Sequence, residues 1–387
     1  MRLPPLFRPW LAAAALIAAV SIGRAEPAAE TPPPPPDVAA KAWYLADFRT
    51  GTVLAQSGAD APLPPASLTK LMTAYIVFDA IAAGRLSLDE RVRVSRKAWR
   101  MRGSRMFIEV DTEVAVGDLL RGLIIQSGND AAVALAEHLA GSEDAFVESM
   151  NERAAALGMT GTTFRNTTGL PARGHVSTAR DLARLASAII AEHPQFHSLY
   201  AEREFTYNNI RQYNRNRLLW RDAAVDGMKT GYTKSAGYCL VGTALRGDMR
   251  LIAVVLGADT PGARTRGSKA LLDYGFEHYE THRLYAKGQP LTVARVWKGA
   301  PAAAPLGLAA DLYVTIPRGG YESLTAVMDL ERRLFAPLEA ELEVGDVSVA
   351  FRGEKLSAAP LVVLKSVSPG GLWTRLKHEL LLWWEQP

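Results

Sequence analysis

The residues best suited to chemistry in this chain are a serine and a lysine three positions apart, Ser67 and Lys70. They follow a proline-rich stretch that ends at Pro65, and they precede the apolar run Leu71–Phe78. Proline is tolerated at the start of a helix but not in its interior, so we expect a helix that begins near Ala66. Residues three apart on a helix share a face, so the hydroxyl and the amine can meet.

A serine hydroxyl is a poor nucleophile until a base removes its proton. The amine of Lys70 can be that base if burial or a neighbouring cation lowers its pKa. A serine near a helix start is, by itself, more often a cap, and the short pattern is frequent by chance. The pair therefore indicates acyl transfer only if other elements bring further polar groups beside it.

A second group of polar residues lies between two expected helices. Helical spacing of apolar residues over Val116–Ile125 is followed by Ser127-Gly128-Asn129, and a further helix is expected over Ala131–Leu139. The tripeptide is therefore predicted to form a tight turn between helices. Serine, glycine and asparagine are common in turns for purely structural reasons, so this motif alone does not indicate a site.

A third group is the tripeptide Lys229-Thr230-Gly231, which precedes two expected strands, Gly237–Ala244 and Arg250–Gly257. At a sheet edge it would present an ammonium and a hydroxyl to a groove. Gly231 would allow another segment to approach the backbone closely. The alternative, a solvated turn, is the simpler interpretation of this motif in isolation.

Composition limits the possible functions. The chain has 387 residues and is 48% hydrophobic, which is enough for a buried core and favours two domains. Its 44 basic and 40 acidic residues give a formal charge of +4, so no nucleic-acid partner is expected. Cys239 is the only cysteine, which excludes an intramolecular disulfide. His175 has no second His or Cys near it with ligand spacing, so we expect no metal and no cofactor.

The first residues have the pattern of an export signal. Residues 1–25 combine early positive charge at Arg2 and Arg8, an apolar run over Trp10–Ile22 and small residues before position 26. The run is too short to span a bilayer, and the alternative is an uncleaved amphipathic anchor. Residues 26–39 contain five consecutive prolines and are expected to form an extended linker.

The remaining periodicity predicts mixed elements followed by a β-rich region. Residues 285–371 contain short alternating segments separated by Gly and Pro, which is typical of a small β domain. Before it, we expect strands over Ala42–Asp47, Gly51–Ala55, Leu86–Val94 and Met106–Val110, and helices over Glu143–Leu157, Thr178–Ile190 and Gly262–Tyr274.

The tail, residues 372–387, has an amphipathic helical pattern. It is too short to span a bilayer, so it is expected to lie in a membrane interface, where tryptophan is favoured. The alternative is a helix docked on the protein's own body. Thr374, Arg375, His378, Glu379 and Glu385 face away from the apolar face. The apolar face consists of Leu372, Trp373, Leu376, Leu380, Trp383 and Trp384.

The three motifs are far more informative together. Ser-x-x-Lys, Ser-x-Asn and Lys-Thr-Gly in this order resemble the motif set of penicillin-binding proteins and serine β-lactamases. The chain resembles most the D-alanyl-D-alanine carboxypeptidases of the penicillin-binding-protein-5 type, in serine peptidase family S11, over essentially its whole mature length. The segments that carry the resemblance are Pro65–Thr73, Ser127–Ala131, Gln212–Asn216 and Asp226–Gly231.

The resemblance implies a fold and a domain order. Residues 40–284 would form an α/β (α+β) penicillin-binding, β-lactamase-like transpeptidase domain with an antiparallel sheet flanked by helices. Residues 285–371 would form a small all-β domain. Residues 372–387 would form a membrane-anchoring helix at the periplasmic face of the inner membrane.

It also implies roles for the motif residues. Ser67 would attack the peptide bond between the two D-alanines of a peptidoglycan stem pentapeptide. Lys70 would act as the general base, and Ser127 would relay a proton to the leaving amine. The backbone N–H groups of Ser67 and Tyr232 would form the oxyanion hole. Family members often have His where this chain has Tyr232, but only the backbone of that residue is needed.

Substrate binding is implied for the other motif residues. Asn129 would hold a substrate amide, and Lys229 and Thr230 would bind the terminal carboxylate beside Gly231. The family tends to carry arginines in the groove at the positions of Arg215 and Arg264.

The same resemblance implies that β-lactam antibiotics are covalent inhibitors and leaves three alternatives open. A class A β-lactamase would carry a Glu-x-x-Leu-Asn motif between Asn129 and Lys229, which is not present. A D,D-endopeptidase that cuts cross-links would use the same chemistry, generally without a β domain or a tail. A non-catalytic peptidoglycan-binding protein would not require all the motif residues to be intact.

Overall fold

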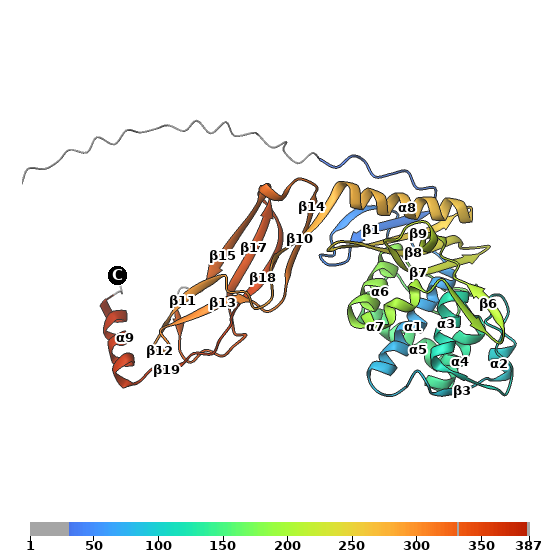
Figure 1. Cartoon of the computed structure of the whole chain (residues 1–387), viewed down its shortest axis with the longest axis horizontal. Coiled ribbons are helices and arrows are strands. Elements are labelled where there is room, and N and C mark those ends of the chain that lie inside the picture. Colours follow the sequence, from blue (N-terminus) through green and yellow to red (C-terminus); the bar gives the residue numbers. More distant parts are fainter. Residues whose placement is uncertain (1–30, 331–332, 385–387) are drawn as a thin grey trace, which may run out of the picture.

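The structure, a computed structural model, describes residues 31–330 and 333–384. Within these residues an α/β domain is followed by a smaller β domain and then by a terminal helix, as Figure 1 shows. The predicted signal peptide lies outside the described residues, as does the start of the linker. The described part of the linker contacts the α/β domain, where Tyr274 donates a hydrogen bond to the carbonyl of Pro33 (2.9 Å).

The α/β domain is built on a five-stranded antiparallel sheet with the order β2-β1-β9-β8-β7. Side chains alternate between its faces, as strand geometry requires. On β9, Ile252 and Val254 join the core under the helices, whereas Ala253 and Val255 join the core under α8. The sheet is therefore apolar on both faces, and both are covered. The strands are β1 (Ala42–Asp47), β2 (Val53–Ser57), β7 (Val225–Thr233), β8 (Gly237–Arg246) and β9 (Met249–Ala258).

Helix α8 (Pro261–His278) covers one face of the sheet, and the other helices of the domain cover the opposite face (Figure 1). Thr260 caps α8 by accepting a hydrogen bond from the N–H of Ala263, and Thr178 caps α6 through the N–H of Asp181. The remaining helices are α1 (Lys70–Ala82), α2 (Arg96–Trp99), α3 (Val116–Arg121), α4 (Asn129–Ala140), α5 (Glu143–Ala156), α6 (Ala179–Glu192) and α7 (Pro194–His197).

One predicted strand is wrong, and another is confirmed only in part. Met106–Val110 is irregular because the carboxylate of Asp130 accepts the N–H groups of Met106 (3.0 Å) and Phe107 (2.9 Å), which a strand would offer to a neighbour. Of Leu86–Val94 only β3 (Arg91–Arg93) is a strand. The small two-stranded sheets of this domain pair β3 with β4 (Glu113–Ala115) and β5 (Glu204–Tyr207) with β6 (Ile210–Tyr213).

The β domain is entered directly from α8 through β10 (Tyr279–Tyr285), which pairs with β14 (Leu312–Pro317). Thr281 and Thr315 tie it to the α/β domain, through Asp47 (2.9 Å) and Thr50 (2.7 Å) respectively. Its main sheet has six strands in the order β15-β17-β18-β13-β11-β16. The other strands are β11 (Thr292–Trp297), β12 (Gly299–Ala300), β13 (Ala303–Leu308), β15 (Leu324–Leu330), β16 (Leu334–Phe335), β17 (Glu343–Phe351), β18 (Glu354–Val363) and β19 (Ser368–Pro369).

The terminal helix α9 (Leu372–Trp384) stands at the far end of the β domain (Figure 1). It docks through its polar face. His378 is buried, accepts a hydrogen bond from the N–H of Lys298 at Nδ1 (2.6 Å) and packs edge-on against Trp297. The apolar face points to solvent, with Trp384 85% exposed. No helix among the described residues is long and apolar enough to cross a bilayer.

Candidate active site

The expected helix at Ser67 begins differently from the prediction. Ala66–Thr69 form a single 3-10 turn, and the α-helix starts only at Lys70. Ala66 has a φ of +48°, which costs free energy in a residue with a Cβ atom. This turn presents Ser67 to a cavity of about 1030 Å³.

Lys70 lies directly behind the nucleophile. Its Nζ donates hydrogen bonds to Ser67 Oγ (3.2 Å), to Asn129 Oδ1 (2.7 Å) and to the carbonyl oxygen of Thr168 (2.7 Å). The side chain is 1% exposed. Burial, aided by the positive charge of Arg215, lowers the pKa of Lys70 to about 7. A large share of the amine is therefore neutral at neutral pH and able to accept the proton of Ser67.

The predicted turn between helices places Ser127 and Asn129 in the lining of the cavity. Ser127 has a φ of +66° and follows a π-helical turn, Gly122–Gln126, that ends the helix begun by α3. Its hydroxyl is buried and has no hydrogen-bond partner among the described residues. Neither Lys70 nor Lys229 is therefore hydrogen-bonded to it. Asn129 bonds Lys70 and also donates to the carbonyl of Arg102 (2.5 Å).

Strand β7 also contributes residues to the lining of the cavity. Lys229 is 2% exposed, and its Nζ donates to the carbonyl oxygen of Thr230 (3.0 Å). Burial lowers the pKa of Lys229 well below its usual value, and the charge of Lys70 adds to this effect. A Cβ atom on Gly231 would lie 3.1 Å from the backbone nitrogen of Ser67. This contact is tighter than most Cβ contacts, so glycine favours the close approach of the strand to the backbone of the nucleophile.

Two groove arginines were expected, and both line the cavity. Arg215 donates a hydrogen bond to Ser104 Oγ (2.7 Å). Arg264 is 7% exposed and lies over the ring of Tyr238, 5.8 Å from its centroid. Tyr232 stacks on the same tyrosine from β7, with ring centroids 4.3 Å apart. Every residue predicted for the site therefore lies at or directly behind one cavity.

The sequence analysis did not identify the loop containing Thr168 and Gly169, which packs against the turn that holds Ser67. Gly169 packs against the turn so closely that a Cβ atom there would lie 1.8 Å from the carbonyl oxygen of Ala66. The loop that contains it also provides the Thr168 carbonyl to Lys70. The sequence signal was weak, a Gly within an irregular stretch.

His175, which the sequence offered no partner, is part of the same support. Its Nε2 lies 2.9 Å from Thr69 Oγ1, whose hydroxyl donates to the carbonyl of Ala66 (2.9 Å). The N–H of Arg165 donates to His175 Nδ1 (3.3 Å). Thr69 can therefore only accept from His175, which fixes the neutral imidazole with its proton on Nε2. Burial, and then the charge of Arg165, lowers the pKa of His175 to about 4.

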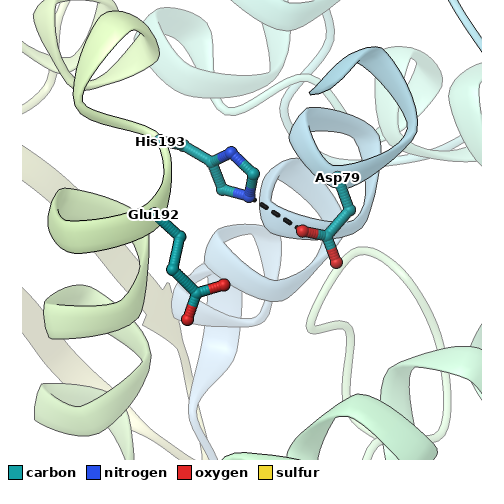
Figure 2. A group of neighbouring side chains, drawn as sticks. All are labelled: Asp79, Glu192 and His193. Carbon is teal, nitrogen blue, oxygen red and sulfur yellow. Dashed lines mark hydrogen bonds and ion pairs between the residues drawn. The ribbon is translucent and has the colours of Figure 1, made fainter. Parts of the chain in front are cut away.

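A second cluster of titratable residues lies away from the cavity, on α1 and α6. Figure 2 shows the imidazole of His193 directed at the carboxylate of Asp79 (2.8 Å), with Glu192 beside them. Their potential ligand atoms lie within 4.8 Å of one another. Arg153 pairs with Asp79, and the hydroxyl of Tyr75 donates to Glu192 (2.6 Å). Each acidic group is thus already engaged, and the cluster fits a structural hydrogen-bond network better than a cation site.

Known proteins share this architecture. Residues 28–260 match the family model described as D-alanyl-D-alanine carboxypeptidase, and residues 279–369 match the penicillin-binding protein 5 C-terminal domain. The chain is 45% identical to the D-alanyl-D-alanine carboxypeptidase DacC of Escherichia coli, over 90% of this chain and 89% of that protein.

Solved structures give the same result. The crystal structure of penicillin binding protein 5 from Haemophilus influenzae covers 87% of this chain and 99% of its own, with a TM-score of 0.81 and 39% identity. Penicillin-Binding Protein D2 from Listeria monocytogenes in its ampicillin-bound form is 34% identical, with a TM-score of 0.58. It covers 63% of this chain and 100% of its own.

Proposed function

The chain belongs to the D-alanyl-D-alanine carboxypeptidase family of serine peptidases, and from this premise we propose that it removes the terminal D-alanine of peptidoglycan stem pentapeptides through an acyl-enzyme on Ser67. The observation that carries the proposal is the contact between the buried Nζ of Lys70, whose pKa is lowered to about 7, and the Ser67 hydroxyl (3.2 Å). A serine hydroxyl becomes an effective nucleophile when a neighbouring base takes its proton, and the amine of Lys70 is placed to do so.

The reaction proceeds in two steps. Lys70 takes the hydroxyl proton of Ser67, the Ser67 oxygen bonds to the carbonyl carbon between the two D-alanines, and the C–N bond breaks. Ser127 passes the proton to the leaving amine, which departs as D-alanine. Water then adds to the ester, and the ester bond to Ser67 breaks, which releases the shortened peptide and restores the hydroxyl.

Backbone N–H groups stabilise the charge that develops on the carbonyl oxygen. The proposed donors are the N–H groups of Ser67 and Tyr232, and the close approach of Gly231 to the Ser67 nitrogen supports this assignment. The substrate carboxylate binds Lys229 and Thr230, with Arg215 and Arg264 nearby, while Asn129 holds the substrate amide. A requirement for a free carboxylate suits a carboxypeptidase. β-Lactams would acylate the same serine.

The test is release of free D-alanine from a stem pentapeptide that ends in D-Ala-D-Ala. The purified protein is compared with a Ser67→Ala variant and with Ser198→Ala, a matched control in which an exposed serine away from the cavity is changed. We expect release from the wild type and from Ser198→Ala, and none from Ser67→Ala.

The other outcomes separate the alternatives. Labelling of Ser67 by a fluorescent penicillin without D-alanine release would favour a D,D-endopeptidase. Neither labelling nor release would leave a non-catalytic peptidoglycan-binding protein.

We also propose that the enzyme is exported and attached to the periplasmic face of the inner membrane through α9. The support is the orientation of this helix: its polar face is occupied by the contact of His378 with Lys298, while Trp373, Trp383 and Trp384 remain 85%, 72% and 85% exposed. An apolar face of this kind is costly in water and suits the headgroup region of a lipid surface. The amino-terminal signal pattern would provide export.

A further inference from the structure

The lining of the active-site cavity contains more positive charge than a single terminal carboxylate requires. Besides Arg215, the cavity is lined by Arg217, Arg221 and Arg264, with Trp220 between the first two in sequence. None of the described residues that line it is Asp or Glu. Neighbouring cations without counter-charges repel one another, so the cavity beside these arginines is suited to bind an anion.

These three arginines are also unpaired. Arg264 is 7% exposed, and its Nε has no hydrogen-bond partner among the described residues. Among the same residues, the side chains of Arg217 and Arg221 form no ion pair or hydrogen bond with protein groups. The carboxylate that follows them in the chain, Asp222, pairs instead with Arg246 (3.0 Å) and Lys269 (3.6 Å). Arg217 and Arg221 are exposed, so the cost of a buried guanidinium without a partner, which a ligand could offset, applies to Arg264.

The charged groups that lower the pKa values of Lys229 and Arg264 show which of these cations lie near one another. Burial is the main reason for the low pKa of Lys229, but the charge of Arg264 contributes to it. Arg217 in turn acts on Arg264, whose pKa is lowered chiefly by burial. Lys229, Arg264 and Arg217 therefore lie close enough to act on one another electrostatically, which puts the arginines near the proposed carboxylate site.

We propose that Arg217, Arg221 and Arg264 form a subsite for a second carboxylate, carried by the side chain of the leaving D-residue. The enzyme would then release an acidic C-terminal D-amino acid as well as D-alanine. The inference rests on the proposed function, because it places the first carboxylate at Lys229 and Thr230. The planar fork of a guanidinium matches a carboxylate with two parallel hydrogen bonds.

The room available agrees with a larger leaving group. D-alanine has only a methyl side chain, whereas the cavity has a volume of about 1030 Å³ and is lined by Trp220, Arg221 and Pro261 as well as Thr230. The chemical step is unchanged: the C–N bond breaks, the leaving amine takes the proton, and water releases the acyl group from Ser67.

The test compares three peptides with the sequence diacetyl-L-Lys-D-Ala-X, in which X is D-Ala, D-Glu or D-Gln. D-Gln has the shape of D-Glu without its charge, so the ratio of kcat/KM for D-Glu to that for D-Gln isolates the second carboxylate. For the wild type we expect a ratio of about ten, the effect of one or two charge-assisted hydrogen bonds. For Arg217→Ala/Arg221→Ala we expect a ratio near one.

The control is Arg266→Ala, an exposed arginine on the same helix as Arg264 that does not line the cavity; it should keep the wild-type ratio. If the double variant does not fold, Arg217→Gln gives the same comparison. Release of D-Ala with equal kcat/KM for D-Glu and D-Gln in the wild type would overturn the subsite but leave the carboxypeptidase intact. Failure to release any of the three residues would instead contradict the proposed function.

Discussion

The active-site cleft and the terminal helix depart from the usual solvation of side chains in opposite directions. In the cleft, Lys70, Lys229 and Arg264 are 1%, 2% and 7% exposed, although charged side chains are seldom buried without an opposite charge. On α9, Trp373 and Trp384 are 85% exposed, although large aromatic side chains are usually covered. Charge is hidden from water in one region, and apolar surface is left in water in the other.

Under the proposed function, the two regions suit chemically opposite partners. Desolvation keeps Lys70 close to neutral and makes the cleft attractive to a carboxylate. Exposed tryptophans make α9 attractive to an apolar layer. Each arrangement costs the isolated protein free energy and would be compensated by the substrate or by the membrane.

The cleft should respond most strongly to loss of its base. Lys70→Ala removes the group that takes the Ser67 proton, so we expect the rate of acylation by a fluorescent penicillin to fall by about a thousandfold or more. Lys355→Ala, a lysine on the exposed surface of the β domain, is the matched control. A Lys70→Ala variant that is labelled at the wild-type rate would show that the buried cation serves no chemistry.

The terminal helix should respond next. Replacing Trp373, Trp383 and Trp384 together by Ala removes most of the exposed aromatic surface of α9, so we expect binding to phosphatidylcholine vesicles to weaken on the order of a hundredfold. Vesicle sedimentation measures it. Val327→Ala changes an exposed apolar residue of the β domain (64% exposed) and should bind like the wild type. Equal binding by all three proteins would contradict the role of α9.

The buried amine also predicts the pH dependence of the cleft. Because the pKa of Lys70 is lowered to about 7, the neutral base is lost as pH falls below 7, and acylation should slow about tenfold for each further pH unit. The same shift affects folding: the unfolded chain binds more protons than the folded one between about pH 7 and the ordinary lysine value, so this group favours folding increasingly as pH rises through that window. An acylation profile that rises only above pH 9 would disprove the assignment.

The smallest effect is expected at the support of the nucleophile. His175→Ala removes the donor to Thr69, so we expect acylation to slow roughly fivefold, the effect of one lost hydrogen bond. His175→Gln, whose amide can donate to Thr69 and accept from Arg165, should restore most of the rate.

The pH dependence of stability distinguishes this support from simple packing. With a pKa of about 4, His175 should contribute a loss of stability as pH falls from the ordinary histidine value towards 4, because the unfolded chain takes up the proton first. The charged groups around the ring are few, with Arg165 on the same loop the main one. Thermal unfolding of wild type and His175→Gln at pH 7 and pH 5 measures it. An equal pH response in both proteins would remove the histidine from this role.

The sequence was sufficient for the motif residues and for most of the core elements. Pro65 before an apolar run, the turn at Ser127 and the alternating strands after Gly231 are local patterns, and each local pattern restricts the backbone directly. The family resemblance and the comparisons agree on the fold. The domain boundaries and residue roles inferred with them remain predictions.

Where sequence reasoning failed, a distant group had changed the local outcome. Met106–Val110 has a strand-like composition, but its N–H groups bond the carboxylate of Asp130, which lies more than 20 residues further along the chain. His175 offered no partner in sequence because its partner, Thr69, lies 106 residues away. Local patterns contain no information on such contacts.

Residue types and periodicity were enough to identify which groups could do chemistry and to predict that α9 would have one apolar face. Only the tertiary structure decided that Lys70 is dry enough to lose its proton, that Gly231 lies against the Ser67 nitrogen, and that α9 docks through its polar face. The physical reason is the same in each case. Burial and close approach depend on what other elements bring to a residue, whereas periodicity and residue type are properties of the chain alone.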